Sequence, residues 1–107
     1  MYNFKKNPLD SSTIELGRRL FYDPILSRDS MLSCAGCHRQ AAAFSDGTAT
    51  FSRGIDSTVQ KRNTLPLFNL AWHSSFFWDG RAPTIEDQVF HPVREPGEMG
   101  MPWAQVA

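Results

Sequence analysis

The hydrophobic and polar positions near the N-terminus follow a helical period. Over residues 12–21 the apolar and small side chains recur every three to four positions and share one face. The run Ser12-Thr13-Ile14-Glu15 has the pattern of a capping box, in which side chains bind the free N–H groups of the first helical turn. Asp23-Pro24 is expected to end the helix, because the residue before a proline avoids helical backbone. Residues 1–10 form a loose arm ahead of it.

Shorter helices are predicted further along the chain. One covers residues 64–72, with Pro66 near its start, where the missing N–H of proline is tolerated. Another opens at Thr84 and runs to about Phe90. A helix is also expected to continue from the paired cysteines through Gln40. The prolines and glycines after residue 91 indicate an extended or looped tail. Convincing strand patterns are absent, so the sequence predicts an all-α domain.

The aliphatic content is low for a domain that packs its own core. Leu, Ile, Val and Phe together make up 24 of the 107 residues, and three Trp add to an aromatic-rich composition. Such a composition suits a single small domain whose centre is filled by a bound apolar group. Residues 43–62 follow neither a helical nor a strand period. So long a loop in a compact domain usually has a function, which here would be to wrap the edge of that group.

Charge and hydropathy exclude several classes of function. The 11 Lys and Arg balance 11 Asp and Glu, so the chain lacks the basic surface that binds nucleic acid or anionic membranes. No run of 18 apolar residues exists that could span a membrane. The first residues contain no apolar segment of the secretory type, so a signal peptide is expected to be absent from this chain.

The two cysteines and the adjacent histidine form Cys34-Ala35-Gly36-Cys37-His38, the attachment pattern of c-type haem. Two thiols at this spacing reach the two vinyl groups of one haem, and the next imidazole binds the iron. Structural zinc needs four ligands, and His73 and His91 lack the spacing of a second pair. A redox dithiol belongs to a βαβ setting, which the sequence lacks. We therefore predict one covalent haem c, and an oxidising compartment such as the bacterial periplasm.

Further stretches of the chain resemble the N-terminal haem domain of the bacterial di-haem cytochrome c peroxidase and MauG family. They are Leu16-Gly17-Arg18-Arg19-Leu20-Phe21-Tyr22-Asp23, Leu26-Ser27, Ser33 through His38, Arg62-Asn63, Phe68-Asn69, Phe77-Trp78-Asp79-Gly80-Arg81, Gln88 and Glu98-Met99. The resemblance implies a cytochrome c-like haem domain over residues 11–101 with long haem-wrapping loops. Residues 102–107 would be the truncated start of a linker to a missing second haem domain.

The resemblance implies that hydrogen peroxide reacts at this haem, on the side opposite His38. Glu98 matches the distal acid and base that moves a proton between the two peroxide oxygens. Gln88 would line the same pocket, and Pro92 matches a position beside it. Without the resemblance, Glu98 would be taken for a solvated surface group and Gln88 for an exposed helical residue.

Three further residues have implied roles with open alternatives. Trp78 matches an electron relay between the two haems, and its alternative is a core aromatic at the domain edge. Asn63 matches a side chain near a calcium ion at the interface with the second domain, and it could equally cap the helix that follows. Arg81 would bind a haem propionate or merely pair with Asp79.

Two features distinguish the chain within the family it resembles. Residues 52–61 contain no histidine, whereas many of these peroxidases carry one there that closes the peroxide site until reduction opens it. The absence resembles the MauG-like branch, whose iron stays open. The chain also has a single haem motif, so a second haem domain or chain would supply the other haem, and an electron-donor protein or a protein substrate would be the partner. His73 and His91 match no ligand position and are expected to be structural or on the surface.

A mono-haem electron-transfer cytochrome is the alternative. Met99 or Met101, about 60 residues after His38, could bind the iron as sixth ligand, which raises the potential and blocks substrate access. Gln88 and Glu98 count against this alternative, because an electron carrier needs neither.

Overall fold

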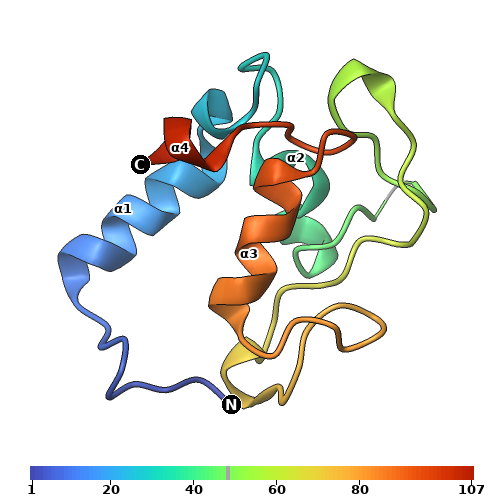
Figure 1. Ribbon diagram of the computed structural model, residues 1–107. Helices are drawn as coiled ribbons and strands as arrows, with labels where there is room; N and C mark the ends of the chain where they lie inside the picture. The colour runs from blue at the N-terminus through green and yellow to red at the C-terminus, as the bar shows by residue number, and fades with distance from the viewer. Residues whose placement is uncertain (48) are drawn as a thin grey trace.

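The computed structural model describes residues 1–47 and 49–107. The regular elements of these residues are α1 (Ser11–Tyr22), α2 (Cys34–Cys37), α3 (Ile85–Arg94) and α4 (Trp103–Val106) (Figure 1). Short 3-10 turns cover Pro24–Leu26, Gln40–Ala42, Ile55–Ser57 and Leu70–Trp72. Within the described residues, strand-like pairing is confined to isolated bridges between Arg39 and Ser45, Arg53 and Val59, and Phe76 and Ala82. The all-α class is confirmed, whereas the wrapping of a haem by the long loops stays a prediction.

The N-cap of helix α1 lies two residues earlier than its sequence pattern predicts. Asp10, rather than Ser12, caps it: the Asp10 carboxylate accepts a hydrogen bond from the Thr13 N–H at 2.9 Å. The hydroxyls of Ser12 and Thr13 donate to the same carboxylate at 2.5 and 2.6 Å, and these bonds hold the pKa of Asp10 well below its usual range. The helix ends before Asp23, as predicted. None of its side chains is fully buried in this chain; Ile14 is exposed, whereas Leu20 and Phe21 are half-buried and Phe21 meets the ring of Phe44 edge-on.

Two predicted helices do not form as expected. The helix predicted to continue through Gln40 stops at the second cysteine, and a separate 3-10 turn follows it. Of the helix predicted over residues 64–72, only the turn Leu70–Trp72 is present. Asn69 interrupts the predicted helix, because its φ of 55° is left-handed. Pro66 also disfavours helical backbone at Leu65 just before it. Both residues lie instead in the wall of a cavity.

Helix α3 is longer than predicted. Thr84 caps its start as expected, since its hydroxyl accepts a hydrogen bond from the backbone N–H three residues on, at 3.1 Å. The predicted end near Phe90 is wrong, because the helix continues through Pro92 to Arg94. Val93 in this last turn is only 3% exposed. Burial of Val93 favours a helix that continues past Phe90. Local sequence rules do not predict this burial, because it depends on contacts with distant segments.

The tail after α3 folds back onto the helix instead of extending away from it. The N–H of Met99 donates to the carbonyl of Pro92 at 3.1 Å. Further on, α4 brings the ring of Trp103 to 4.2 Å, between centroids, from the ring of Phe90. The looped alternative is confirmed for residues 95–102, which lie between α3 and α4, whereas an extended tail is wrong because these tertiary contacts bend it around the end of α3.

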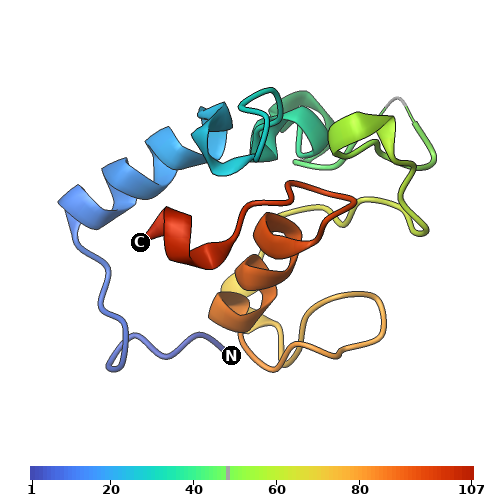
Figure 2. The same ribbon diagram turned by 45° about the horizontal axis from the view of Figure 1, so that its top comes forward.

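The buried apolar core is small, and it lies beside the cavity. Its members are Ile55, Phe76, Ala82, Val93 and Met99. Most of them come from loops, and α3 supplies one. Figure 2 shows α1 and α2 in one layer and α3 with α4 in another. The space between these layers is where the candidate site is found.

Ser27 is fully buried and organises the turn that leads into α2. Its hydroxyl lies 3.0 Å from the carbonyl of Pro24 and accepts a hydrogen bond from the N–H of Leu32 at 3.1 Å. Ser27→Ala leaves that N–H without its partner, so we expect the free energy of unfolding to fall by about 1–3 kcal/mol. Denaturant unfolding of the haem-loaded chain measures this, with the exposed Ser74→Ala as the control. Equal midpoints for the two variants would contradict the prediction.

Candidate functional site

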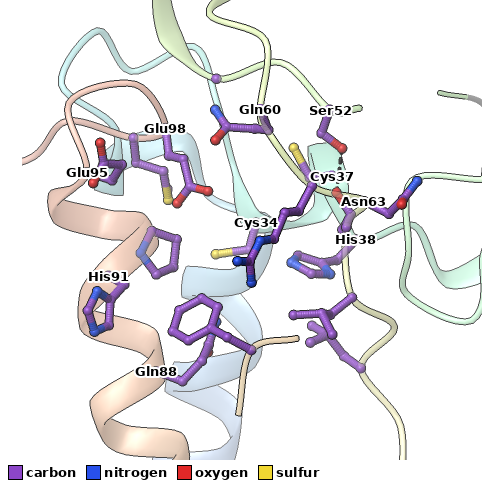
Figure 3. A pocket seen from close by; sticks show the side chains of 18 of the residues that line it. Cys34, Cys37, His38, Ser52, Gln60, Asn63, Gln88, His91, Glu95 and Glu98 are labelled. Carbon is purple, nitrogen blue, oxygen red and sulfur yellow. Dashed lines mark hydrogen bonds between the residues drawn. The ribbon is translucent and has the colours of Figure 1, made fainter. Parts of the chain in front are cut away.

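A cavity of about 530 Å³ lies between α2 and α3 (Figure 3). Its volume is typical of sites that enclose a cofactor or small ligand. Every site residue predicted from the sequence lines it: Cys34, Cys37, His38, Asn63, Trp78, Arg81, Gln88, Pro92 and Glu98. The fold therefore brings together residues that are widely separated in the sequence.

The thiols of Cys34 and Cys37 both line the cavity from a single helical turn. Residues three positions apart share one side of a helix, so α2 places both sulfurs together. Both cysteines are free and half-buried, and burial raises the pKa of each thiol. For Cys37 the hydroxyl of Ser52 opposes this shift, while the carboxylates of Asp46 and Glu98 add to it. A redox dithiol needs a lowered thiol pKa, so these surroundings count against that alternative.

His38 is held in one orientation by the backbone. Its Nδ1 lies 2.7 Å from the carbonyl oxygen of Phe44. A carbonyl only accepts hydrogen bonds, so Nδ1 carries the proton and Nε2 keeps its lone pair for a metal. Burial lowers the pKa of the imidazole, although the carbonyls of Phe44 and Leu65 and the charge of Asp46 oppose the shift. The side chain is therefore neutral at pH 7, which is the form that binds iron.

Gln88, Pro92 and Glu98 line the wall of the cavity across from His38. Gln88 and Pro92 belong to α3, and Glu98 lies in the segment that follows the helix. Figure 3 shows Gln88 and Glu98 on the α3 side and the imidazole of His38 on the other side. A ligand in the cavity would thus have an imidazole on one side and an amide and a carboxyl group on the other.

The carboxyl group of Glu98 is half-buried, and burial raises its pKa. The nearby carboxylate of Glu95 raises it further, and the guanidinium of Arg81 partly opposes both effects. A carboxyl group with a raised pKa exchanges protons closer to neutral pH than an exposed one, as general acid–base catalysis requires. The alternative that Glu98 is a solvated surface group does not fit this burial.

Trp78 and Asn63 both line the cavity and are joined by a hydrogen bond. The indole of Trp78 is 59% exposed, and its N–H donates to the backbone carbonyl of Asn63 at 2.9 Å. Trp78 is therefore no core aromatic of this chain. The side-chain amide of Asn63 donates to the carbonyl of Thr50 at 2.7 Å. Its alternative role as a helix cap is wrong, because the helix it was to cap does not form.

Calcium near Asn63 stays a prediction. No group of three or more His, Cys, Asp or Glu that could hold a metal ion occurs in the described part of the chain. A calcium ion takes six to eight oxygen ligands, so the residues around Asn63 alone do not make such a site.

Arg81 contacts both Asp79 and an aromatic ring. Its Nη1 lies 3.0 and 3.2 Å from the two carboxylate oxygens of Asp79, and its guanidinium carbon is 3.5 Å from the ring centroid of Phe77. These contacts confirm the pairing with Asp79 and hold Arg81 at the edge of the cavity. Binding to a haem propionate stays a prediction.

The other two histidines and one of the two candidate methionines also line the cavity. His73 and His91 are exposed and line the cavity; His73 stacks on the ring of Phe76 and His91 meets the ring of Phe77 edge-on. Met99 lines the cavity but is 4% exposed, and the lining within the described residues does not include Met101.

Gln60 is a cavity residue that the sequence did not single out. It lies in a loop that follows neither a helical nor a strand period, so no local pattern draws attention to it. Its amide nitrogen donates to the carbonyl of Gly97 at 2.7 Å, a contact that only the folded chain creates.

The helical fold and this cavity define a small domain built around a c-type haem-attachment motif, with a polar wall opposite the histidine. The chain belongs to the di-haem cytochrome c peroxidase family, whose model matches residues 11–107. Over 97 residues it is 44% identical to the methylamine utilization protein MauG of Methylorubrum extorquens, covering 91% of this chain and 27% of that protein. Over 95 residues it is 42% identical to the cytochrome c peroxidase Ccp of Escherichia coli, covering 89% of this chain and 20% of that protein.

Solved structures have the same fold. A MauG-like protein associated with microbial copper homeostasis superposes with a TM-score of 0.85 at 38% identity, covering 94% of this chain and 29% of that one. The diheme peroxidase BthA from Burkholderia thailandensis E264 gives a TM-score of 0.76 at 28% identity, covering 85% of this chain and 27% of that one. The chain thus spans between 20% and 29% of the length of these four relatives.

Proposed function

We propose that this chain is the peroxide-reacting haem domain of a di-haem cytochrome c peroxidase or MauG-like oxidoreductase. Membership of the family supports this proposal. The observation that carries it is the arrangement of the cavity, where the half-buried carboxyl group of Glu98 lies across from the imidazole of His38. The mono-haem electron carrier is not favoured, because such a protein has no use for a proton-transferring carboxyl group at this position.

The residues of the cavity fit one covalently attached haem c. Cys34 and Cys37 would hold it through thioether bonds, and Nε2 of His38 would bind the iron. The walls supply apolar contacts for a porphyrin from Leu32, Leu65, Leu67, Leu70, Ile85, Phe76 and Phe77. When bound, the haem supplies an iron centre that accepts peroxide and exchanges electrons. Arg81, which lines the cavity, would pair with a propionate.

Glu98 would act on protons at the distal side. Its carboxylate would take the proton from the peroxide oxygen nearer the iron and return it to the outer oxygen, which then leaves as water. Gln88, in the same wall, would orient the peroxide by a hydrogen bond from its amide. Pro92 has no N–H and would limit the space beside the bound peroxide without competing for its hydrogen bonds.

A second haem domain or chain would complete the enzyme. Trp78 is largely exposed, so its indole is available as an electron relay to a second haem packed against it. An electron-donor protein or a protein substrate would be the partner, and a calcium ion near Asn63 would lie at the interface between domains. Covalent haem attachment favours the bacterial periplasm. Among the described helices, none has the length and apolarity needed to cross a lipid bilayer.

The proposal is tested by the ferric absorption and electron paramagnetic resonance spectra of the haem-loaded chain, before and after addition of hydrogen peroxide. We expect a high-spin spectrum that changes with peroxide, because His38 is the single protein ligand proposed. A low-spin spectrum that peroxide leaves unchanged would overturn the proposal. Met99→Leu and Met101→Leu would then show whether either sulfur fills the sixth position.

A further inference from the structure

The segment that carries Glu98 is attached to a loop far from it in the sequence. The carbonyl of Gly97 accepts a hydrogen bond from the side-chain amide of Gln60 at 2.7 Å. The carbonyl of Glu98 accepts one from the N–H of Ile55 at 2.7 Å, and the carbonyl of Met99 accepts one from the N–H of Arg28 at 2.9 Å. Three consecutive carbonyls are therefore fixed from outside their own segment.

Gly54 makes the approach of the two segments close. A Cβ atom at this position would lie 1.9 Å from the carbonyl oxygen of Gly97 and 2.7 Å from the Cα of Glu98. Both distances are far below van der Waals contact, so a residue larger than glycine forces the segments apart. The φ angle of Gly54 is −86°, which any residue adopts, and so the requirement for glycine is one of space.

Buried side chains strengthen this attachment, and an exposed ion pair adds a small contribution. Ile55 and Met99 are 3% and 4% exposed, which places both in the small apolar core. Arg28 adds an ion pair with Asp56 of the same loop at 2.7 Å. The loop thus contacts the Glu98 segment through backbone, amide and apolar groups together.

The position of the Glu98 carboxyl group depends on this backbone. Within residues 1–47 and 49–107, no hydrogen bond from another side chain holds that carboxyl group. Figure 3 shows Gln60 and Glu98 at the same edge of the cavity. The main chain at Gly97 and Glu98 therefore sets the Cα position from which the Glu98 side chain reaches into the cavity, and a shift of this main chain moves the carboxyl group with it.

We propose that Gln60 and Gly54 are positioning residues for Glu98. The loop 52–60 holds residues 95–101, which include Glu98, against the cavity. This loop belongs to the stretch 52–61 that contains no histidine, so the proposal gives that stretch a function. The inference rests on the proposed function, because it assumes that the carboxyl group of Glu98 transfers the proton.

The test uses Gln60→Leu and Gly54→Ala in the haem-loaded chain. Gln105→Leu and Gly17→Ala are the matched controls, since Gln105 is exposed in α4 and a Cβ at Gly17 meets nothing within 4 Å. Two quantities are measured for each variant: amide hydrogen exchange of residues 95–101, and the second-order rate constant with hydrogen peroxide across a range of pH.

We expect both test variants to speed amide exchange in residues 95–101 and to slow the peroxide reaction. For Gly54→Ala the rate constant should fall by about 100-fold, the usual effect of a misplacement near 1 Å. The loss for Gln60→Leu is expected to be about tenfold, from one hydrogen bond of about 1.4 kcal/mol. In a Glu98→Gln background neither substitution should slow the reaction further, because the group they position is already gone. The controls should change neither quantity.

The possible failures can be told apart. Faster exchange without a slower peroxide reaction would mean a structural role alone and would overturn the inference. Unchanged exchange and an unchanged rate would overturn it as well. If Glu98→Gln itself leaves the rate unchanged, the proposed function of Glu98 fails, and with it the positioning role. Gln60→Leu keeps the test decisive if Gly54→Ala does not fold.

Discussion

Glu98→Gln is expected to slow the reaction of the haem-loaded chain with hydrogen peroxide by a factor of about 10²–10⁴, the usual contribution of a general acid–base group. Glutamine has nearly the same shape but cannot accept the proton that must leave the peroxide. Stopped-flow absorption at increasing peroxide concentration gives the second-order rate constant for the wild type and the variant. A change of less than about threefold would contradict the role of Glu98.

The pH dependence provides a sharper form of this prediction. Burial and the charge of Glu95 raise the pKa of Glu98, so its carboxylate form appears at higher pH than that of an exposed glutamate. The rate constant of the wild type should therefore rise with pH through a midpoint above the ordinary glutamate pKa. The Glu98→Gln profile should lack this midpoint.

Glu95→Gln is the matched control. Glu95 is exposed and lines the same cavity, but it has no proposed part in the proton transfer. Removal of its negative charge makes the Glu98 carboxylate easier to form, so the midpoint should move to lower pH while the maximal rate is kept. A midpoint that stays in place would show that the titrating group is not Glu98.

Loss of the two thiols is expected to have the second large effect. Cys34→Ala/Cys37→Ala should give a chain without covalent haem and without a cooperative unfolding transition. Without the haem, the apolar walls of the cavity lose the group they would pack against, and a core of only five buried apolar residues in the described part of the chain remains to stabilise the fold.

Haem content and thermal unfolding measure this second effect. Haem that stays with the protein after acid–organic extraction is covalently bound. Ser33→Ala is the matched control beside the motif, because the Ser33 side chain makes no capping hydrogen bond to α2. It should keep both the haem and the transition. A double cysteine variant that melts like the wild type would mean that the protein core alone stabilises the fold.

Local sequence rules succeeded where the interactions themselves are local. The caps at the starts of α1 and α3 depend on side chains within three residues of the helix, and both helices were predicted, with the cap of α1 displaced by two residues. The same rules failed where distant contacts compete with local preference. The helix expected over residues 64–72 gives way to a cavity wall, and α3 passes Pro92 because Val93 is buried against other segments.

The haem-attachment motif could be predicted without knowledge of the fold, because Cys34, Cys37 and His38 lie within five consecutive residues. The distal residues Gln88 and Glu98 came from resemblance to a family, since nothing in their own surroundings marks them in the sequence. That they share a cavity with His38 was decided by the tertiary structure.

The sequence by itself determined the helical class, the haem-attachment motif and its histidine, because these depend on residues that are neighbours in the chain. The tertiary structure alone decided how Glu98 is held. Its segment is fixed by Gln60, Ile55 and Gly54, all more than 35 residues away. Hydrogen bonds and close contacts over such separations arise only when the chain folds, and no periodicity in the sequence encodes which partners will meet.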